Sequence, residues 1–182
     1  MSPNPRETQI PVVQVPADFD LAQFTAGFLR SASNRICDVT QEVTGTSDAS
    51  YDPSSLGCYQ PSAATRSTLI KATDFLFKDE DYFFGTAAMI DWYEEAVKDV
   101  QSCSQDGVKT VANQVLERLR ELTQTDAYFF LLLDAFNDSN VLGLLYDALR
   151  DFAKEFMPNN TSPDLYEAGK NAGYFLKSVF DL

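Results

Sequence analysis

Apolar side chains recur at intervals of three and four residues along most of this sequence. The clearest case is the stretch 108–122, where an apolar stripe is formed by Val108, Val111, Val115, Leu119 and Leu122. An α-helix brings residues at this spacing onto one face, and the charged residues between them then lie on the opposite face. No stretch shows the strict alternation that is typical of a half-buried strand. The sequence therefore predicts an all-α protein.

The same periodicity predicts helices through the rest of the chain. The stretch 44–61 interrupts the pattern, because it is rich in Ser, Gly, Asp and Pro and is predicted to be a long loop. Together these segments predict a bundle of six or seven helices. The predicted helices cover approximately residues 20–37, 62–76, 81–100, 108–122, 126–136, 139–157 and 163–182.

Local signals mark where two of these helices begin. Asp20 is a predicted N-cap with Gln23 at the third helical position. Phe19 and Phe24 flank that cap at the spacing of a hydrophobic staple. The pair Ser162-Pro163 is the predicted start of the last helix, because Pro is favoured at the first helical position.

The first 18 residues have a different character from the rest. Their prolines, at positions 3, 5, 11 and 16, are incompatible with a helix and favour an extended path. We therefore expect an arm over residues 1–18 and a single helical domain over residues 19–182. The arm is either a frayed terminus or a segment that lies on the domain or on a neighbouring subunit. In the second case its apolar residues are interface candidates, namely Ile10, Val12, Val13 and Val15.

Charge and composition exclude several classes of partner and of chemistry. The chain has 27 acidic and 14 basic residues, and a net charge of −13 disfavours binding to nucleic acid and to anionic membrane surfaces. No run of about 18 apolar residues is present that would span a bilayer. Histidine is absent, which removes the commonest general base, zinc ligand and activator of Ser or Cys nucleophiles. We expect no catalytic residue, no metal and no cofactor.

Clusters of carboxylates are the remaining source of possible chemistry. Asp91 and Glu95 lie one helical turn apart, as an acid–base pair or a divalent-cation site requires. Solvated helix faces carry such pairs routinely. Another group of carboxylates, along residues 147–155, is interleaved with Arg and Lys. We interpret these clusters as solvated surface, and an enzyme acting through carboxylates alone stays a minor alternative.

Aromatic residues are abundant, with 14 Phe, 8 Tyr and one Trp. The triplets 82–84 and 128–130 place aromatic rings on several sides of their helices, which is more than one face can bury. Either these two helices are central in a large core, or the surplus rings contact a partner or an apolar ligand. Phe84, Phe129 and Phe130 are therefore interface candidates.

Gly169 and Gly173 form a small-residue pair four positions apart in the last predicted helix. Such a pair permits a close approach between helices. It serves either the packing of this helix inside the domain or a contact between subunits.

Cysteine and asparagine positions bear on the compartment. Three cysteines are predicted to gather at one end of the bundle, where one disulfide is geometrically accessible. Three Asn-x-Ser/Thr triplets lie in predicted loops. The first residues lack an apolar leader segment, so the protein is either cytoplasmic or secreted with a numbering that begins after a removed leader. We expect a secreted or lumenal protein. The disulfide candidates are Cys37, Cys58 and Cys103, and the glycosylation candidates are Asn137, Asn159 and Asn160.

Short motifs near both ends carry a resemblance. They are Phe24-x-x-Gly27-Phe28-Leu29, Tyr166-x-Ala168-Gly169-Lys170-x-x-Gly173 and Lys177-x-Val179-Phe180. These motifs resemble the ends of small secreted all-helical proteins of ciliates that contain cysteines. The resemblance spans about a quarter of the chain, and it implies a secreted helical protein with a cysteine pair and no known chemistry.

The sequence as a whole favours a non-enzymatic structural or interaction protein. In this interpretation an acidic helical bundle assembles with copies of itself or within a larger complex, through the arm, the surplus rings and an unpaired cysteine. The alternative is a carrier that holds an apolar, lipid-like ligand in a cavity lined by aromatic residues of the third, fifth and sixth helices.

Overall fold

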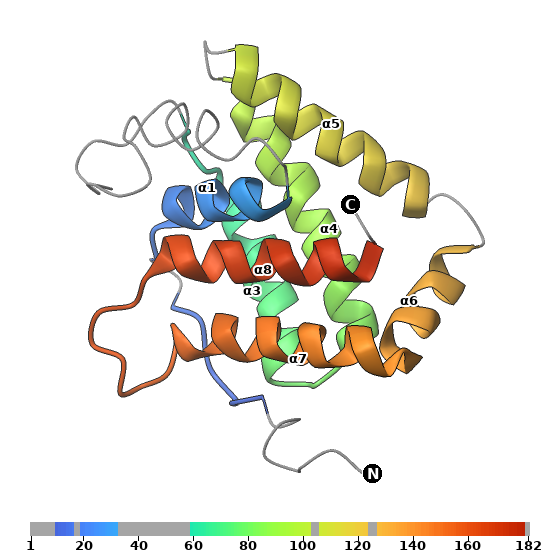
Figure 1. Ribbon diagram of the computed structural model, residues 1–182. Coiled ribbons are helices and arrows are strands. Elements are labelled where there is room, and N and C mark those ends of the chain that lie inside the picture. The colour runs from blue at the N-terminus through green and yellow to red at the C-terminus, as the bar shows by residue number, and fades with distance from the viewer. Residues whose placement is uncertain (1–9, 17–18, 33–58, 103–105, 124–126, 181–182) are drawn as a thin grey trace.

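The computed structural model describes residues 10–16, 19–32, 59–102, 106–123 and 127–180. These residues form seven α-helices and no strand, so the prediction of an all-α bundle is confirmed (Figure 1). The helices are α1 (Leu21–Ala32), α3 (Ala63–Phe77), α4 (Tyr82–Val100), α5 (Asp106–Thr123), α6 (Ala127–Asn137), α7 (Ser139–Lys154) and α8 (Leu165–Phe180).

The start of α1 follows the predicted cap. The backbone N–H of Gln23 donates to Asp20 Oδ1 over 3.2 Å. The rings of Phe19 and Phe24 meet edge to face with centroids 6.2 Å apart, which is the expected staple. Every residue of α1 except Gln23 and Arg30 is buried. This helix is therefore an interior element of the bundle.

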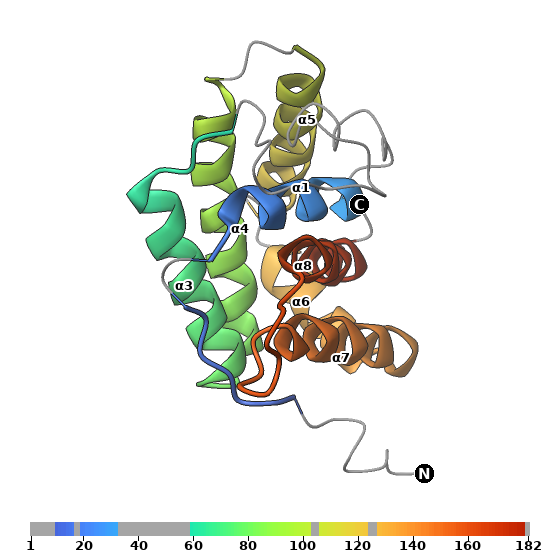
Figure 2. The same ribbon diagram turned by 90° about the vertical axis from the view of Figure 1, so that its left-hand side faces the viewer.

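Helix α8 lies between α1 and α7, as both views show (Figures 1 and 2). Its contact with α1 depends on small residues. A Cβ atom at Gly169 would collide with the carbonyl oxygen of Phe24, and one at Gly27 would collide with the carbonyl oxygen of Tyr166. The hydroxyl of Ser31 donates to the carbonyl of Lys170 over 2.6 Å. The two backbones thus approach closely at these positions.

Aromatic rings fill the centre of the bundle around Trp92, which is fully buried. The rings of Phe24 and Phe28 meet it edge to face, with centroids 5.3 Å and 4.9 Å away. Tyr93 packs beside Phe28, and its hydroxyl donates to the carbonyl of Ala112 over 2.7 Å. Helices α1, α4 and α5 are joined at this point.

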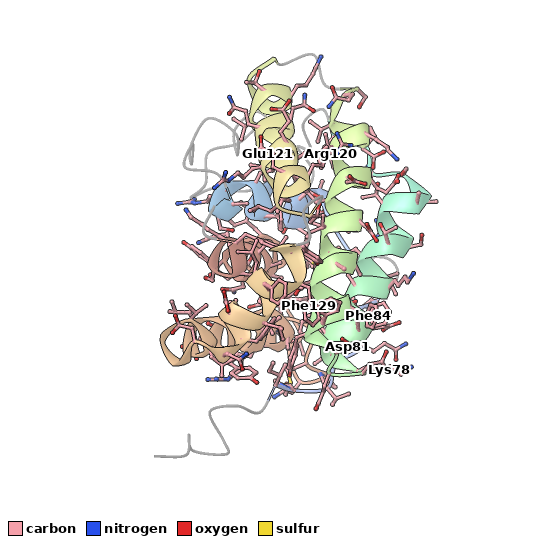
Figure 3. The ribbon with its side chains drawn as sticks, turned by 90° about the vertical axis from the view of Figure 1, so that its right-hand side faces the viewer. Lys78, Asp81, Phe84, Arg120, Glu121 and Phe129 are labelled. Carbon is pink, nitrogen blue, oxygen red and sulfur yellow. The ribbon has the colours of Figure 1, made fainter. Side chains whose placement is uncertain are left out.

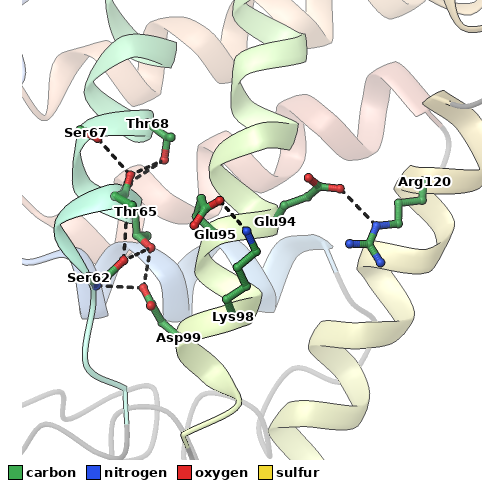
Figure 4. A network of polar contacts seen from close by, with 10 residues as sticks. Ser62, Thr65, Ser67, Thr68, Glu94, Glu95, Lys98, Asp99 and Arg120 are labelled. Atoms are coloured by element: carbon green, nitrogen blue, oxygen red, sulfur yellow. Dashed lines mark hydrogen bonds and ion pairs between the residues drawn. The ribbon is translucent and has the colours of Figure 1, made fainter.

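Helices α3 and α4 run side by side and are held together at both ends (Figures 1 and 2). Ser62 caps α3 by accepting from the N–H of Thr65, and Asp81 caps α4 by accepting from the N–H of Phe84. At the far end of α4, Asp99 accepts hydrogen bonds from the Ser62 N–H and the Thr65 hydroxyl (Figure 4). The carboxylate therefore fixes the first turn of α3.

Two predicted boundaries need correction. Helix α7 ends at Lys154 and not near residue 157, because the side-chain amide of Asn160 donates to the carbonyls of Lys154 and Glu155 and ends the helix there. Helix α8 begins at Leu165, with Asp164 as its cap, rather than at Ser162-Pro163. Ser162 is engaged differently, since its N–H donates to Asn160 Oδ1 over 3.1 Å.

The described part of the N-terminal arm, residues 10–16, forms neither helix nor strand. Ile10, Val13 and Val15 are buried and belong to the same core as the helices. Val12 is 68% exposed. The arm therefore lies on its own domain, where it borders Ile70 of α3 (Figure 2). The division into an arm over residues 1–18 and a domain over 19–182 stays a prediction.

Candidate interaction surface

Four apolar side chains of α4 and α6 are exposed next to one another. Phe84, Phe129 and Phe130 are 56%, 49% and 63% exposed, and Leu133 is 40% exposed. Phe84 and Phe129 lie on one side of the molecule, where α6 approaches the first turns of α4 (Figure 3). We call these four residues the aromatic surface.

The first turn of α4 explains the position of Phe84. The cap at Asp81 fixes the helix start, so that residues 82, 83 and 84 point in three directions. Tyr82 turns inward and stacks on Phe136 of α6 with centroids 5.9 Å apart. Phe83 is half-buried, and Phe84 is left on the outside. The core contacts of Tyr82 thereby determine the exposure of its neighbour.

The same arrangement occurs at the start of α6. Tyr128 stacks on Phe180 of α8, with centroids 6.0 Å apart and nearly parallel rings. Phe129 and Phe130 follow it in the chain and cannot share that direction on a helix. They therefore project outward.

The rings of the aromatic surface support one another. Phe84 stacks on Phe75 of α3 at 6.0 Å and meets Phe83 edge to face at 5.5 Å. Phe83 in turn contacts Phe129 at 5.6 Å, and Phe129 contacts Phe130 at 5.9 Å. These offset and edge-to-face pairs are the favoured geometries of aromatic rings. The exposed rings therefore form a connected layer together with the half-buried Phe75 of α3 and Phe83 of α4.

Burial and nearby charge alter the titration of groups beneath this layer. Burial, with smaller contributions from Tyr146 and Glu80, raises the pKa of Tyr82 to about 12. Burial and the neighbouring Asp91 raise the pKa of Tyr128 to about 12. Desolvation also raises the pKa of the Asp91 carboxyl, and Glu94 adds to that shift. Both tyrosines are neutral at physiological pH.

The prediction that the fifth helix could be central is not what the structure shows. Helix α6 lies at the edge of the bundle and leaves Phe129, Phe130 and Leu133 exposed. The reason is that α8 already occupies the centre, between α1 and α7. The alternative that these rings contact a partner or an apolar ligand stays a prediction.

The other interface candidates have different positions. Gly169 and Gly173 are buried against α1, where a Cβ atom at Gly173 would collide with the hydroxyl of Ser31. This pair therefore serves packing inside the domain, and the subunit alternative does not apply to it. In the arm, Ile10, Val13 and Val15 are also covered by their own chain, which leaves Val12 as its accessible candidate.

Two open grooves border the arm. One has a volume of about 430 Å³ between residues 12–15 and α3. The other has a volume of about 330 Å³ and lies next to the loop that joins α7 to α8. The carrier alternative builds its cavity from rings of the third, fifth and sixth predicted helices. Phe156, from the sixth, lines the second groove, whereas no ring of α4 or α6 lines either groove.

The compartment-related residues are only partly described. All three cysteines, Cys37, Cys58 and Cys103, lie outside the described residues. Asn137 and Asn159 are exposed at helix and loop positions. Asn160 differs from them, since its side-chain amide is used to end α7.

The carboxylate clusters are engaged in surface ion pairs (Figure 4). Glu95 pairs with Lys98 at 2.7 Å, and Glu94 pairs with Arg120 at 3.1 Å. The groups of α7 are paired in the same way, Asp147 with Arg150 and Asp151 with Lys154. Among the described residues no group of three or more acidic or Cys side chains could hold a metal ion. These contacts are typical of a solvated helix face.

Sequence reasoning missed parts of the aromatic surface. Leu133 was not named among the interface candidates. Phe75 and Phe83, which support the surface from beneath, were not named either, although the ring of Phe83 lies between Phe84 and Phe129. The available signal was the spacing from Phe129 to Leu133, which is one helical turn.

Comparison with family models, with curated proteins and with solved structures finds no match to this chain. Within the described ranges no helix combines the length and the apolar character needed to cross a bilayer.

Proposed function

We propose that this protein is a non-enzymatic structural or interaction protein, an acidic helical bundle that assembles with copies of itself or within a larger complex. The aromatic surface is the observation that carries the proposal. The largest contiguous apolar patch on a protein surface is often functional, and exposed apolar patches rimmed by polar residues mark protein–protein contacts. Aromatic residues are also enriched in such contacts over the rest of the surface.

The physical gain from covering this surface is considerable. Each exposed Phe ring offers on the order of 100 Å² of apolar area, since a whole ring buries 150–250 Å². Covering the three rings would contribute on the order of 7 kcal/mol before the entropic cost of association. Because the rings already contact one another, little side-chain entropy is lost when a partner docks.

Size-exclusion chromatography with light scattering on natively purified protein tests this proposal. We expect an assembly larger than the 20.3 kDa monomer, and its dissociation by Phe129→Ser/Phe130→Ser. The matched control is Leu144→Ser/Tyr174→Ser, which changes two exposed apolar residues outside the aromatic surface and should leave the assembly intact. A monodisperse monomer at all concentrations, with no partner protein bound in natively purified material, would overturn the proposal.

We also propose that the protein is secreted or lumenal, glycosylated, and cross-linked through two of its three cysteines. The exposure of Asn137 and Asn159 supports the proposal, because both amides are accessible to a modifying enzyme. Peptide mapping of native material tests it. Reduced thiols at all three cysteines together with unmodified asparagines would contradict it.

A further inference from the structure

Acidic side chains surround the aromatic surface. Asp134 is exposed on α6, one turn beyond Phe130, and so lies on the same helix face. Asp81 lies at the first turn of α4, below Phe84 in Figure 3. Glu80, the residue before it, is exposed in the turn between α3 and α4.

Asp91 completes this group, since it is exposed two helical turns beyond Phe84 and so lies on the same face of α4. We call Glu80, Asp81, Asp91 and Asp134 the acidic rim. Lys78 is the basic side chain seen beside Asp81 in Figure 3, and Lys71 acts on Asp91. The residues named here are thus four carboxylates and two ammonium groups.

A second copy of this chain fits the surface poorly. In a two-fold dimer the same patch faces itself, so the acidic rim of one copy would meet the acidic rim of the other. Each copy also carries a net charge of −13, which adds long-range repulsion. The apolar rings favour association, but the charges around them favour a partner of opposite sign.

We propose that the aromatic surface binds a basic amphipathic segment of a partner protein. The inference rests on the proposed function and names the kind of partner. Apolar side chains of that segment pack on Phe84, Phe129 and Phe130, and its Lys and Arg side chains reach the acidic rim. Arg or Lys over the faces of the exposed rings adds a cation–π attraction.

The test uses the full recombinant chain and three labelled peptides of about 15 residues, long enough to form a helix when bound. The first has Leu on one helical face and Lys on the other. The second replaces Lys by Glu, and the third replaces Leu by Ser. Fluorescence anisotropy measures binding of each peptide to the protein.

We expect the Leu/Lys peptide to bind at least about tenfold more tightly than either of the others, because it alone supplies both apolar contacts and positive charge. Phe129→Ser/Phe130→Ser should weaken it by about tenfold or more, whereas Leu144→Ser/Tyr174→Ser should not. Glu80→Gln/Asp134→Asn should weaken binding and reduce its dependence on salt. The last variant leaves the rings and the α4 cap untouched, so it tests the charge without risk to the fold.

Equal binding to both serine variants would mean that the peptide senses only the net charge, and would overturn the inference. Equal binding of the Leu/Glu peptide, or tighter binding of the protein to neutral lipid vesicles through the same rings, would overturn it as well. Self-association of the recombinant chain through the aromatic surface, without peptide binding, would contradict this inference but leave the proposed function standing. A monomer that binds nothing would contradict both.

Discussion

Helices α1 and α8 and helices α4 and α6 use apolar residues in opposite ways. Between α1 and α8, glycines at positions 27, 169 and 173 bring two backbones into contact, and nothing of that contact is left for a partner. Between α4 and α6, large rings hold the helices apart and remain half exposed. The pair α1 and α8 packs inside the core, whereas the pair α4 and α6 carries a layer of partly exposed rings at the edge of the core.

This difference shows that the size of the side chains between two helices determines whether their apolar surface is buried inside the domain or stays exposed. Small residues let two helices pack closely inside the domain, because their backbone atoms then come into direct contact. Large rings stacked at an edge cannot all be buried by their own chain, so some of their area stays available. The regions therefore predict opposite responses to substitution.

The largest contrast is expected for truncating one ring in each region. Phe28→Ala in α1 removes a ring that packs on Trp92 and Tyr93, and should lower the free energy of unfolding by about 4 kcal/mol. Phe130→Ala in α6 removes a ring that is 63% exposed, and should change it by less than about 0.5 kcal/mol. Urea unfolding followed by circular dichroism measures both. Similar losses would show that the aromatic surface is part of the core.

The next contrast concerns the glycines. Gly169→Ala places a Cβ atom against the carbonyl oxygen of Phe24, so α1 and α8 must separate, and we expect a loss of about 3 kcal/mol. Gly143→Ala is the matched control in α7, because a Cβ atom there meets nothing. It should stabilise the protein by up to about 1 kcal/mol, since Ala favours a helix over Gly. A thermal melt that is unchanged by Gly169→Ala would contradict the close contact.

The helices were predictable because local signals and core packing agree. The stripe of α5 is buried at Val111, Val115 and Leu119, as its periodicity requires. The cap of α1 at Asp20 forms as the sequence indicates. The start of α8 was misplaced because the N–H of Ser162 donates to Asn160 Oδ1, two residues earlier, and this local turn takes the place of the predicted helix cap.

The aromatic surface was predictable only in part. Phe84, Phe129 and Phe130 were proposed from an excess of rings, and the structure leaves them exposed. Whether these rings would be buried depended on which helix lies at the centre of the bundle. The spacing of apolar residues does not show whether α6 or α8 takes that position. Gly169 and Gly173 show the same limit, because a small-residue pair looks alike inside a domain and between subunits.

Alkaline pH should destabilise the packing of Tyr82 and Tyr128 beneath the aromatic surface. Burial raises the pKa of Tyr82 and of Tyr128 to about 12 in the folded protein, above the value near 10 of an exposed tyrosine. The stability that these two tyrosines contribute to the folded protein is therefore fully present below about pH 10, and it is lost as the pH rises through about 12. Tyr82→Phe/Tyr128→Phe should reduce this loss, and Tyr174→Phe, on an exposed ring, should not. Urea unfolding midpoints measured at about pH 9 and about pH 11 test this expectation. It would be contradicted if the unaltered protein and all variants lost the same stability between these two pH values.

The smallest expected effect concerns the cap that orients Phe84. Asp81→Ala removes the acceptor of the Phe84 N–H and should cost about 1 kcal/mol. Asp79→Ala, which removes an exposed carboxylate two residues earlier, is the control and should change stability by less than about 0.5 kcal/mol.

Amide hydrogen exchange separates the local consequence of the cap from the global one. Loss of the cap should speed exchange at Phe84 and Gly85 far more than at Tyr93, because the first turn frays while the middle of α4 stays packed. Uniform acceleration along α4 would show that the cap supports the whole helix. Selective fraying would show that one carboxylate holds Phe84 in the aromatic surface, where its ring contacts both Phe75 and Phe83.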